Sequence, residues 1–436
     1  MTIESAVISA LSLEEPEIFV GGLTILERHI LGLYYNGVKK ITVVLPDKVE
    51  KTPVFRRKFD DLTLIFTNKP VDFFDSYYIK SNTVFHKALF DELERAADAG
   101  EGKNILVTGK AMHGSLWLTQ SEGFSIDGYI DLWTGLAFLN AETLKSMFEL
   151  ETSDSDFDIR FFEDNYSSPD FLTVSGNNRF FHRISGKADA KSAESLLFHS
   201  LRKPQDGLVA RIFNRTMSLP VSKILSKTNL TPNQLSVINA FFAVIAGFFL
   251  VFGHSMLGLS FYISGLLGGL FMQMCSIYDG CDGEIARVKF QYSHLGDWLD
   301  TIIDDITNCI FFASVAAWAW FSTGQERFIY MGVAAFIGQW LANYSMYYYL
   351  IKIAKTGNNQ DYKVTNSSEG PVAVFFEKIK YLTKRDFHLF AFFLLGVFGR
   401  LDIGAYFICA FAVSAGLILI SQHIMLLIKG SRAVKA

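Results

Sequence analysis

Apolar residues are concentrated in the second half of the chain, where they form long segments. A helix needs about 20 such residues to cross the hydrocarbon layer of a membrane, and most of these segments reach that length. The fifth, FHLFAFFLLGVFG, is short. The pattern predicts six transmembrane helices, at residues 234–253, 256–278, 298–321, 328–351, 387–399 and 403–428.

The first half of the chain alternates short apolar runs with an amphipathic segment. Val7 and Ile8 begin a strand, and residues 23–36 form an amphipathic helix that Gly37 stops. The runs KKITVVLP and KNILVTGKAMHG indicate buried parallel strands, and DGYIDLWTGLAFLNAETL contains a strand and the start of a helix. We therefore expect a soluble α/β domain over residues 1–198.

The overall composition and charge of the chain indicate no particular partner. Of the 436 residues, 50% are hydrophobic, and the net charge of −4 gives no sign of a nucleic-acid partner. The four cysteines lack CxxC spacing, which favours packing roles over a disulfide or zinc site. The N-terminal sequence has neither a basic region nor an apolar core, so we expect no signal peptide.

Basic residues predict the orientation of the helices. The loop between the fourth and fifth apolar segments and the C-terminal tail are rich in lysine and arginine, whereas the opposite loops contain few. Such residues favour the cytoplasmic side. We therefore expect a multi-pass protein of the cell membrane, with both termini and the loop between the second and third segments in the cytoplasm.

Residues 199–230 form the predicted linker between the two halves. Apolar residues there alternate with arginines and lysines, a pattern typical of a helix lying in the membrane interface. Thr231 then caps a new helix with Pro232 at its first position. The predicted membrane domain covers residues 231–430.

Four carboxylates lie at the ends of the second and third apolar segments. Asp279 and Asp282 are three residues apart, and Asp300 and Asp304 are four apart, so each pair shares a helix face. Four such charges cannot lie together beside a membrane without cations between them. Hard oxygen ligands select Mg²⁺, Mn²⁺ or Ca²⁺, and such ions typically hold phosphates. The alternative is a solvated acidic loop.

The residues around these aspartates decide between the two readings. Gly283 and Ala286 are small enough for a ligand to approach the backbone, and Arg287 is a planar cation suited to phosphate. With Gly296, the aspartates complete the pattern DxxDGxxAR, eight residues, then GxxxDxxxD. This pattern resembles the signature of the CDP-alcohol phosphotransferase family and argues against a solvated loop.

The resemblance implies a six-helix homodimer with a polar cavity open to the cytoplasm and two divalent ions, Mg²⁺ or Mn²⁺. Asp279, Asp282 and Asp300 would bind the metal ions. Asp304 would be the general base and a further ligand. The CDP group would contact Gly283, Ala286, Arg287 and Gly296. Of the acidic residues outside the pattern, we interpret Asp297 as a surface residue and Asp305 as a capping residue or a support for the ligands.

A second resemblance concerns the linker. It is similar to bifunctional proteins that fuse an inositol-1-phosphate cytidylyltransferase to a di-myo-inositol-phosphate-phosphate synthase. This implies that Asn233 contacts the nucleotide, the alternative being a plain helix-start amide. The matching residues are Lys203, Pro204, Asp206, Gly207, Arg211, Asn214, Arg215, Ser218, Thr231, Pro232 and Asn233.

Acceptors in this branch often carry a phosphate, which requires a basic residue near the metal ions. Arg385, at the start of the fifth segment, is our first candidate, and Lys289 is the second. For both, the alternative is a topological role, because positive residues gather on the cytoplasmic side.

Residues 1–195 resemble the nucleotidyltransferase (GT-A-like) α/β fold, but functional residues of that fold are missing. Its Gly-rich loop holds a triphosphate after the first strand, whereas this chain has SLEEPEIFVGG there. After ILV it has TGKAMHG in place of a metal-binding aspartate. The acid-rich TSDSDFDIRFFED reads as a solvated loop. We therefore expect a degenerate domain that packs, regulates or delivers substrate.

Three hypotheses follow. The first is an integral-membrane CDP-alcohol phosphotransferase that releases CMP, in phospholipid or inositol-phosphodiester synthesis. Its donor would be CDP-diacylglycerol or CDP-inositol, and its acceptor a polyol or polyol phosphate. The second is a bifunctional enzyme with an additional active cytidylyltransferase domain. The third is a non-enzymatic lipid-binding or scaffold protein, which would tolerate loss of the aspartates.

Overall fold

The computed structural model divides the chain into two compact units. The first consists of Met1–Leu201 with Val288–Phe290, and the second of Arg202–Arg287 with Gln291–Ala436. The residues that the structure describes are 3–11, 18–46, 59–70, 72–100, 103–110, 123–126, 129–149, 157–165, 168–175, 179–202, 206–357 and 384–433.

A mostly parallel sheet forms the centre of the first unit, with strand order β11-β8-β10-β6-β1-β4-β5 and β9 paired with β10. β1 (Ser5–Ser9) lies between β4 (Lys40–Val44) and β6 (Ser76–Lys80) and is parallel to both. β10 (Tyr129–Leu139) runs antiparallel to β6 and to β8 (Asn104–Lys110). The other strands of the sheet are β5 (Thr63–Thr67), β9 (Gly123–Ile126) and β11 (Phe171–Ser175).

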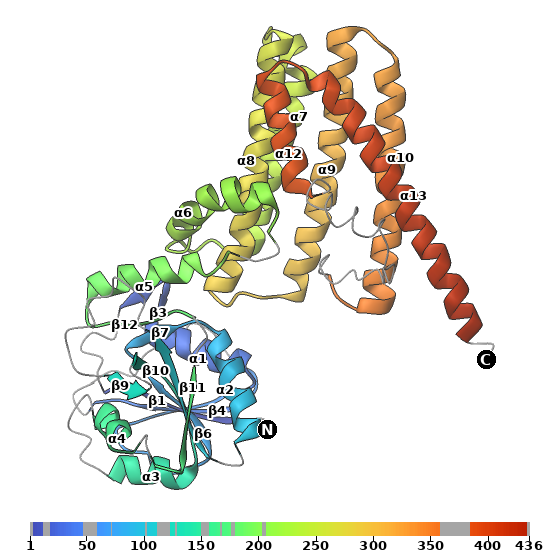
Figure 1. Ribbon diagram of the computed structural model, residues 1–436. Coiled ribbons are helices and arrows are strands. Elements are labelled where there is room, and N and C mark those ends of the chain that lie inside the picture. Colours follow the sequence, from blue (N-terminus) through green and yellow to red (C-terminus); the bar gives the residue numbers. More distant parts are fainter. Residues whose placement is uncertain are drawn as a thin grey trace. The chain divides into compact units, whose positions relative to one another are not determined.

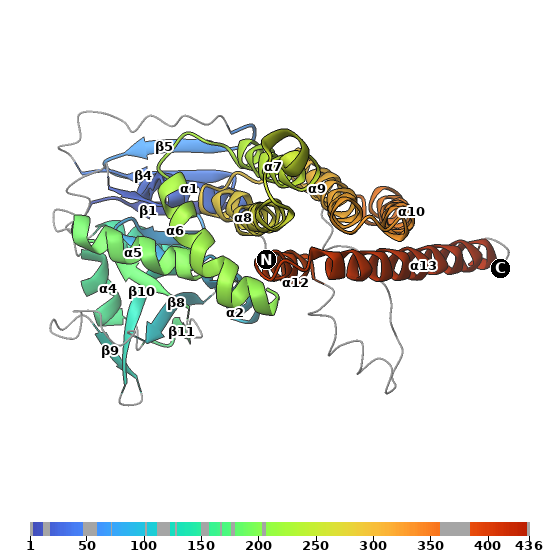
Figure 2. The same ribbon diagram turned by 90° about the horizontal axis from the view of Figure 1, so that it is seen from above.

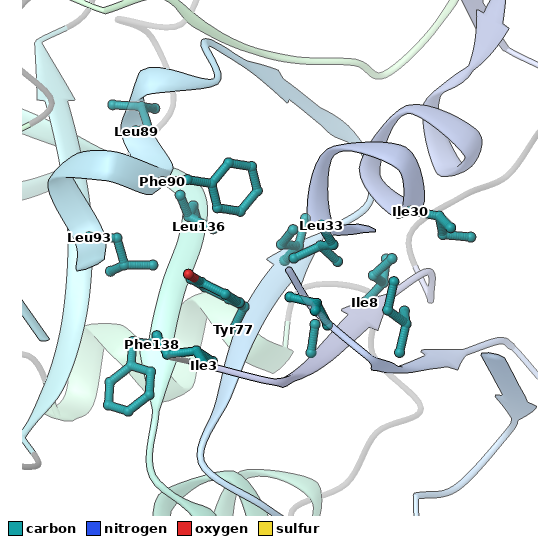
Figure 3. Packing of buried hydrophobic residues seen from close by; sticks show 14 of the residues in the cluster. Ile3, Ile8, Ile30, Leu33, Tyr77, Leu89, Phe90, Leu93, Leu136 and Phe138 are labelled. Atoms are coloured by element: carbon teal, nitrogen blue, oxygen red, sulfur yellow. The ribbon is translucent and has the colours of Figure 1, made fainter. Parts of the chain in front are cut away.

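Helices cover both faces of this sheet (Figure 1). Successive residues of a strand point to opposite faces. Ile8 and Tyr77 therefore pack with α1 (Ile25–Tyr35) and α2 (Ala88–Ala99), as Figure 3 shows. Their neighbours Val7 and Tyr78 pack on the other face with α3 (Ala141–Glu149) and α4 (Phe157–Asn165). The smaller elements are β2 (Phe19–Val20), β3 (Leu23–Thr24), β7 (Thr83–Phe85), β12 (Phe181–Arg183) and α5 (Lys187–His199).

The predicted α/β class of the first unit is confirmed. The start of its first helix, α1, is set by a capping residue. Thr24 caps α1 and forms a capping box with Glu27. The segments expected to replace the triphosphate loop and the metal-binding aspartate lie largely outside the described residues.

The prediction of a solvated loop at TSDSDFDIRFFED is wrong where the segment is described. α4 begins at Phe157, and the next residue, Asp158, is fully buried. Its carboxylate lies 2.7 Å from Lys80 Nζ and accepts a hydrogen bond of 3.0 Å from the Tyr78 hydroxyl. A sequence pattern cannot reveal this, because the partners come from a strand almost 80 residues earlier.

The second unit is helical, and a helix lies at each of the six predicted places. Four of them, α7, α8, α9 and residues 401–421 of α13, are long and apolar enough to cross a membrane, so the full count of six spans stays a prediction. The helices are η2 (Ala210–Asn214), α6 (Arg215–Leu225), α7 (Pro232–Leu257), α8 (Phe261–Val288), α9 (His294–Thr323), α10 (Arg327–Tyr349), η3 (Leu350–Ala354), α12 (Arg385–Val397) and α13 (Leu401–Ala433).

The ends of the long helices follow from capping residues. The predicted cap at Thr231 is present and forms a capping box with Gln234, with Pro232 at the first position of α7. Ser293 caps α9 through the Gly296 N–H. α7 and α9 stop at glycines in the left-handed conformation, Gly258 and Gly324, which a residue with a side chain rarely adopts.

Close packing holds these helices together. α9 contacts both α7 and α10 and lies between them in Figure 2. α10 and α13 approach each other backbone to backbone, because a Cβ added to Gly338 would lie 2.4 Å from the Ala412 carbonyl oxygen. Small residues at such crossings are typical of helix contacts in membranes.

Candidate metal and substrate site

Three of the predicted metal ligands lie together in the second unit. One carboxylate oxygen from each of Asp279, Asp300 and Asp304 lies within 4.8 Å of those of the other two. Asp279 comes from α8, and the other two come from the first turns of α9. The spacing of four residues places Asp300 and Asp304 on one face of α9, as predicted. The structure thus brings these residue types together as a metal centre requires.

Asp282, the fourth aspartate, is buried beside this carboxylate cluster and is held by α7. The Ser236 hydroxyl donates a hydrogen bond to its carboxylate. On the same helix, Asn239 Nδ2 donates to Asp279 Oδ1 at 3.1 Å. The sequence reasoning missed both α7 residues. Their spacing of three residues on an apolar helix was the available signal.

Arg385 joins the carboxylate cluster from the start of α12. Its Nη1 donates to Asp279 Oδ1 at 2.9 Å and also to Asp304, while Nη2 donates to the Thr307 hydroxyl at 2.8 Å. Its Nε atom is buried and has no hydrogen-bond partner among the described residues. A guanidinium with a spare donor beside carboxylates can hold an anion that approaches the same point.

The residues expected to contact CDP fall into two neighbourhoods. At the helix starts, a Cβ on Gly296 would lie 3.1 Å from Asn233 Oδ1, so these two residues of α9 and α7 are adjacent. On α8, a Cβ on Gly283 would lie 3.2 Å from Arg287 Nη1, and Arg287 Nε is buried without a partner among the described residues. Ala286 is partly buried, and its carbonyl accepts from the Gln291 N–H.

The remaining candidates have different surroundings. Asp297 is exposed, and the Tyr347 hydroxyl of α10 donates to Asp305. Lys289 is buried and, with Val288 and Phe290, is part of the first unit. Of the two candidates, Arg385 is the one whose hydrogen bonds to the carboxylate cluster the structure gives.

The carboxylate cluster fits a divalent ion. All three of its side chains are hard oxygen donors, which suit Mg²⁺ or Mn²⁺ and disfavour soft metals. None of the four cysteines belongs to it. Asp279 and Asp304 each accept a bond from a cation in this structure, so both carboxylates are oriented toward positive charge.

Comparison with known proteins agrees with these features. Residues 229–427 match the family model described as CDP-alcohol phosphatidyltransferase. The matched residues lie in the second unit. The match lies on the helices that carry the carboxylate cluster.

Several curated relatives match part of the chain. A bifunctional IPC transferase and DIPP synthase of Archaeoglobus fulgidus is 36% identical over 135 residues, 30% of this chain and 25% of that protein. A protein of the same name from Thermococcus kodakarensis is 31% identical over 32% of this chain and 29% of that protein. A phosphatidylinositol phosphate synthase of Corynebacterium glutamicum is 31% identical over 24% of this chain and 43% of that protein. The chain thus matches less than half of the length of each.

Solved structures of nucleotidyltransferases resemble part of the chain only weakly. The inositol-1-phosphate CTP transferase of T. maritima has 14% identity and a TM-score of 0.32, covering 45% of this chain and 96% of that one. A UDP-glucose pyrophosphorylase of Acinetobacter baumanii has 10% identity and a TM-score of 0.33, covering 47% and 95%. Likenesses at this level identify no activity for the first unit.

Proposed function

We propose that this protein is a membrane CDP-alcohol phosphotransferase, with its active site at the carboxylate cluster of α8 and α9. The observation that carries the proposal is the meeting of Asp279, Asp300 and Asp304 within 4.8 Å of one another. These are residues of the pattern DxxDGxxAR…GxxxDxxxD, whose spacing places the aspartates of each helix on one face, and helix packing brings the two faces together. A scaffold protein has no need of this arrangement.

The reaction transfers a substituted phosphoryl group. Asp304 accepts the proton of the acceptor hydroxyl, whose oxygen then forms a bond to the β-phosphorus of the CDP-alcohol. The bond between that phosphorus and the bridging oxygen breaks, and CMP leaves with the electron pair. Asp279, Asp282 and Asp300, with Asp304, would hold two Mg²⁺ or Mn²⁺ ions. Bound there, the ions would supply positive charge to the pyrophosphate.

Side chains of α7 keep the metal-binding aspartates in place. The hydrogen bonds from Ser236 to Asp282 and from Asn239 to Asp279 fix the two carboxylates of α8 before any ligand arrives. Such partners of metal ligands orient them and raise metal affinity. Asn233, adjacent to Gly296, would contact the nucleotide at the starts of α7 and α9, and Gly283, Ala286 and Arg287 would contact it from α8.

Arg385 would bind the phosphate of a phosphorylated acceptor. Its guanidinium is already fixed beside Asp304, the proposed base, and its Nε has no partner among the described residues. An anionic acceptor held there presents its hydroxyl close to the group that takes the proton. The relative named as a phosphatidylinositol phosphate synthase favours an inositol-phosphate-like acceptor.

A second candidate is a bifunctional enzyme that also makes its own CDP-alcohol. The names of the curated relatives favour it. Against it, the sequence lacks the Gly-rich triphosphate loop after the first strand. In addition, Asp158 is paired with Lys80 inside the first unit and is therefore not free to bind a metal ion.

CMP release by the full chain in nanodiscs tests the proposal. CDP-diacylglycerol and CDP-inositol are each offered with Mg²⁺ or Mn²⁺ to a panel of polyols and polyol phosphates. We expect one donor to give CMP with a phosphorylated polyol, and none after EDTA. CMP formation from CTP and a polyol phosphate alone would instead favour the bifunctional enzyme. Absence of CMP with every pair would contradict the transferase.

A further inference from the structure

The short helical segment before α7 buries polar residues and exposes large apolar ones. We call η2 and α6 together, residues 210–225, the juxtamembrane helix. Its buried side includes the polar residues Asn214 and Ser218 beside Leu219, whereas Ile212 and Ile224 are exposed. Buried polar groups require hydrogen-bond partners. The partners show what this helix holds.

One partner is the helix that carries Asp279 and Asp282. Glu284, two residues after Asp282, is fully buried and accepts hydrogen bonds from Arg215 and from the Ser218 hydroxyl at 2.8 Å. Arg215 also binds Asp206 with two donors, at 3.0 and 3.1 Å. Burial alone would lower the pKa of Arg215, but Asp206 and Glu284 together hold that pKa above its usual value. The guanidinium is therefore a permanent cation between two carboxylates.

The same side of α8 carries further attachment points. Asn214 Nδ2 donates to the Ser276 hydroxyl at 2.9 Å, and Gln273 Nε2 donates to Asn214 Oδ1 at 2.8 Å. A Cβ on Gly280 would lie 2.8 Å from Arg215 Nη1, so the missing side chain leaves room for the guanidinium. The attachment points recur every three to four residues and form one face of α8: Gln273, Ser276, Gly280 and Glu284. Holding this face fixes the rotation of α8 and hence the direction of its aspartates.

The other partner is the helix that carries Arg385. Asp386, the next residue, accepts a hydrogen bond from the Ala210 N–H at 2.8 Å. A carboxylate at the start of a helix satisfies a free N–H and interacts favourably with the helix dipole. A Cβ on Gly207 would lie 2.4 Å from this carboxylate, and the rings of Phe213 and Phe390 are 5.3 Å apart. α12 is thus attached beside Arg385 itself.

We propose that the juxtamembrane helix is a brace that sets the position of Arg385 against Asp279 and Asp304. Arg215, Glu284 and Asp386 are its positioning residues. α8 and α12 also pack closely away from the site, where a Cβ on Gly396 would lie 2.8 Å from the Gly265 carbonyl oxygen. The brace spans the parts of the two helices that carry the site residues. The expected change in the acceptor KM rests on the proposed function. The expected change in hydrogen exchange rests on the geometry of the helices alone.

The kinetic test compares Asp386→Ala with Asp386→Asn in the full chain. Alanine removes the acceptor for the Ala210 N–H, whereas asparagine keeps an oxygen there. We expect Asp386→Ala to raise KM for the phosphorylated acceptor by about tenfold, the effect of losing one hydrogen bond to a charged group. KM for the CDP donor stays within about twofold, and asparagine largely restores the acceptor KM. A change in donor KM of the same size would overturn the proposal.

The structural test needs no activity and therefore separates this proposal from the proposed function. Arg215→Gln breaks the attachment to Glu284, and Arg211→Gln is the matched control on an exposed position of the same helix. Hydrogen exchange is measured in nanodiscs over the first turn of α12. The brace predicts at least about threefold faster exchange there in Arg215→Gln, because the ion pair between the juxtamembrane helix and Glu284 of α8 is lost. Faster exchange confined to α6 and α8 would overturn the brace.

If the wild-type protein forms no CMP, the proposed function is wrong. The hydrogen-exchange measurement would still test whether the juxtamembrane helix positions α12. If Arg215→Gln does not fold, Asp386→Ala provides the second exchange measurement from the other end of the brace. It predicts faster exchange over residues 207–214 together with the start of α12. Unchanged exchange in both segments would overturn the proposal.

Discussion

Arg385 Nη1 lies 2.9 Å from Asp279 Oδ1, and this bond joins the start of α12 to the carboxylate cluster across 106 residues of chain. The same nitrogen also donates to Asp304, the proposed base. A cation and two carboxylates that share one point in a largely apolar unit are costly to assemble. Their presence together supports the proposed transfer of a phosphoryl group.

Replacing Arg385 should discriminate between acceptors. For Arg385→Gln we expect kcat/KM with a phosphorylated polyol to fall by at least about 30-fold, or about 2 kcal/mol, because a partly buried cation that faces anions is lost. With the unphosphorylated polyol the decrease should be much smaller. Initial rates of CMP release with the two acceptors measure the difference. Equal losses with both would show that Arg385 does not recognise the phosphate.

Gly296→Ala should weaken nucleotide binding. The added Cβ would lie 2.8 Å from Ser293 Oγ, which caps α9, and 3.1 Å from Asn233 Oδ1. Both side chains must move, so we expect KM for the CDP donor to rise by about tenfold. The acceptor KM serves as the internal control. If the acceptor KM rises and the donor KM does not change, Gly296 and Asn233 do not form the nucleotide site.

Lys80→Met should destabilise the first unit. It leaves the carboxylate of Asp158 buried without its cation, which costs about 3–5 kcal/mol of unfolding free energy. Lys39→Met is the matched control, since its partner Glu4 is exposed and such pairs contribute at most about 1 kcal/mol. Urea unfolding followed by hydrogen exchange of first-unit peptides gives both values. Equal midpoints for the two variants would contradict a buried pair.

The first unit should also lose stability in mild acid. Burial lowers the pKa of His29 to about 4. An unfolded histidine binds a proton near pH 6.5, so the unfolded state takes up more protons between about pH 6.5 and 4. Stability therefore falls as pH decreases through this window, by about 3 kcal/mol in total for His29.

Unfolding midpoints of the first unit at pH 7.5, 6 and 5 measure the acid effect. His29→Gln should reduce the pH dependence, whereas His199→Gln, at an exposed position, should not. The dependence that remains comes from His86 and His182, whose pKa values burial also lowers. A wild-type midpoint that is constant across this range would contradict a buried neutral His29.

Much of the site could be predicted because it depends on helical spacing. Asp300 and Asp304 are four residues apart on one helix, so their shared face follows from the period of the helix. The cap at Thr231 is equally local. In the first unit, Val7 and Ile8 pack on opposite faces of the sheet, as strand geometry requires.

The rest depends on partners far apart in the chain. Nothing local to Asp386 indicates that it accepts a bond from Ala210, 176 residues earlier. Glu284 lies inside the signature at an unspecified position, and its partner Arg215 looked like one of several interfacial cations. The sequence reveals that a charge is present in an apolar region. Which charge neutralises it is decided by packing between helices.

Asp304→Asn gives the most direct test of the central claim, with Asp297→Asn as the matched control. Both residues are on α9, but Asp297 is exposed and outside the carboxylate cluster. With saturating CDP-alcohol, acceptor and Mg²⁺ or Mn²⁺, we predict that kcat for CMP release falls by about 10²–10⁴-fold in Asp304→Asn, because the general base is lost. The control should stay near wild type. Equal CMP release by Asp304→Asn and wild type, or release that survives EDTA, would contradict the proposed mechanism.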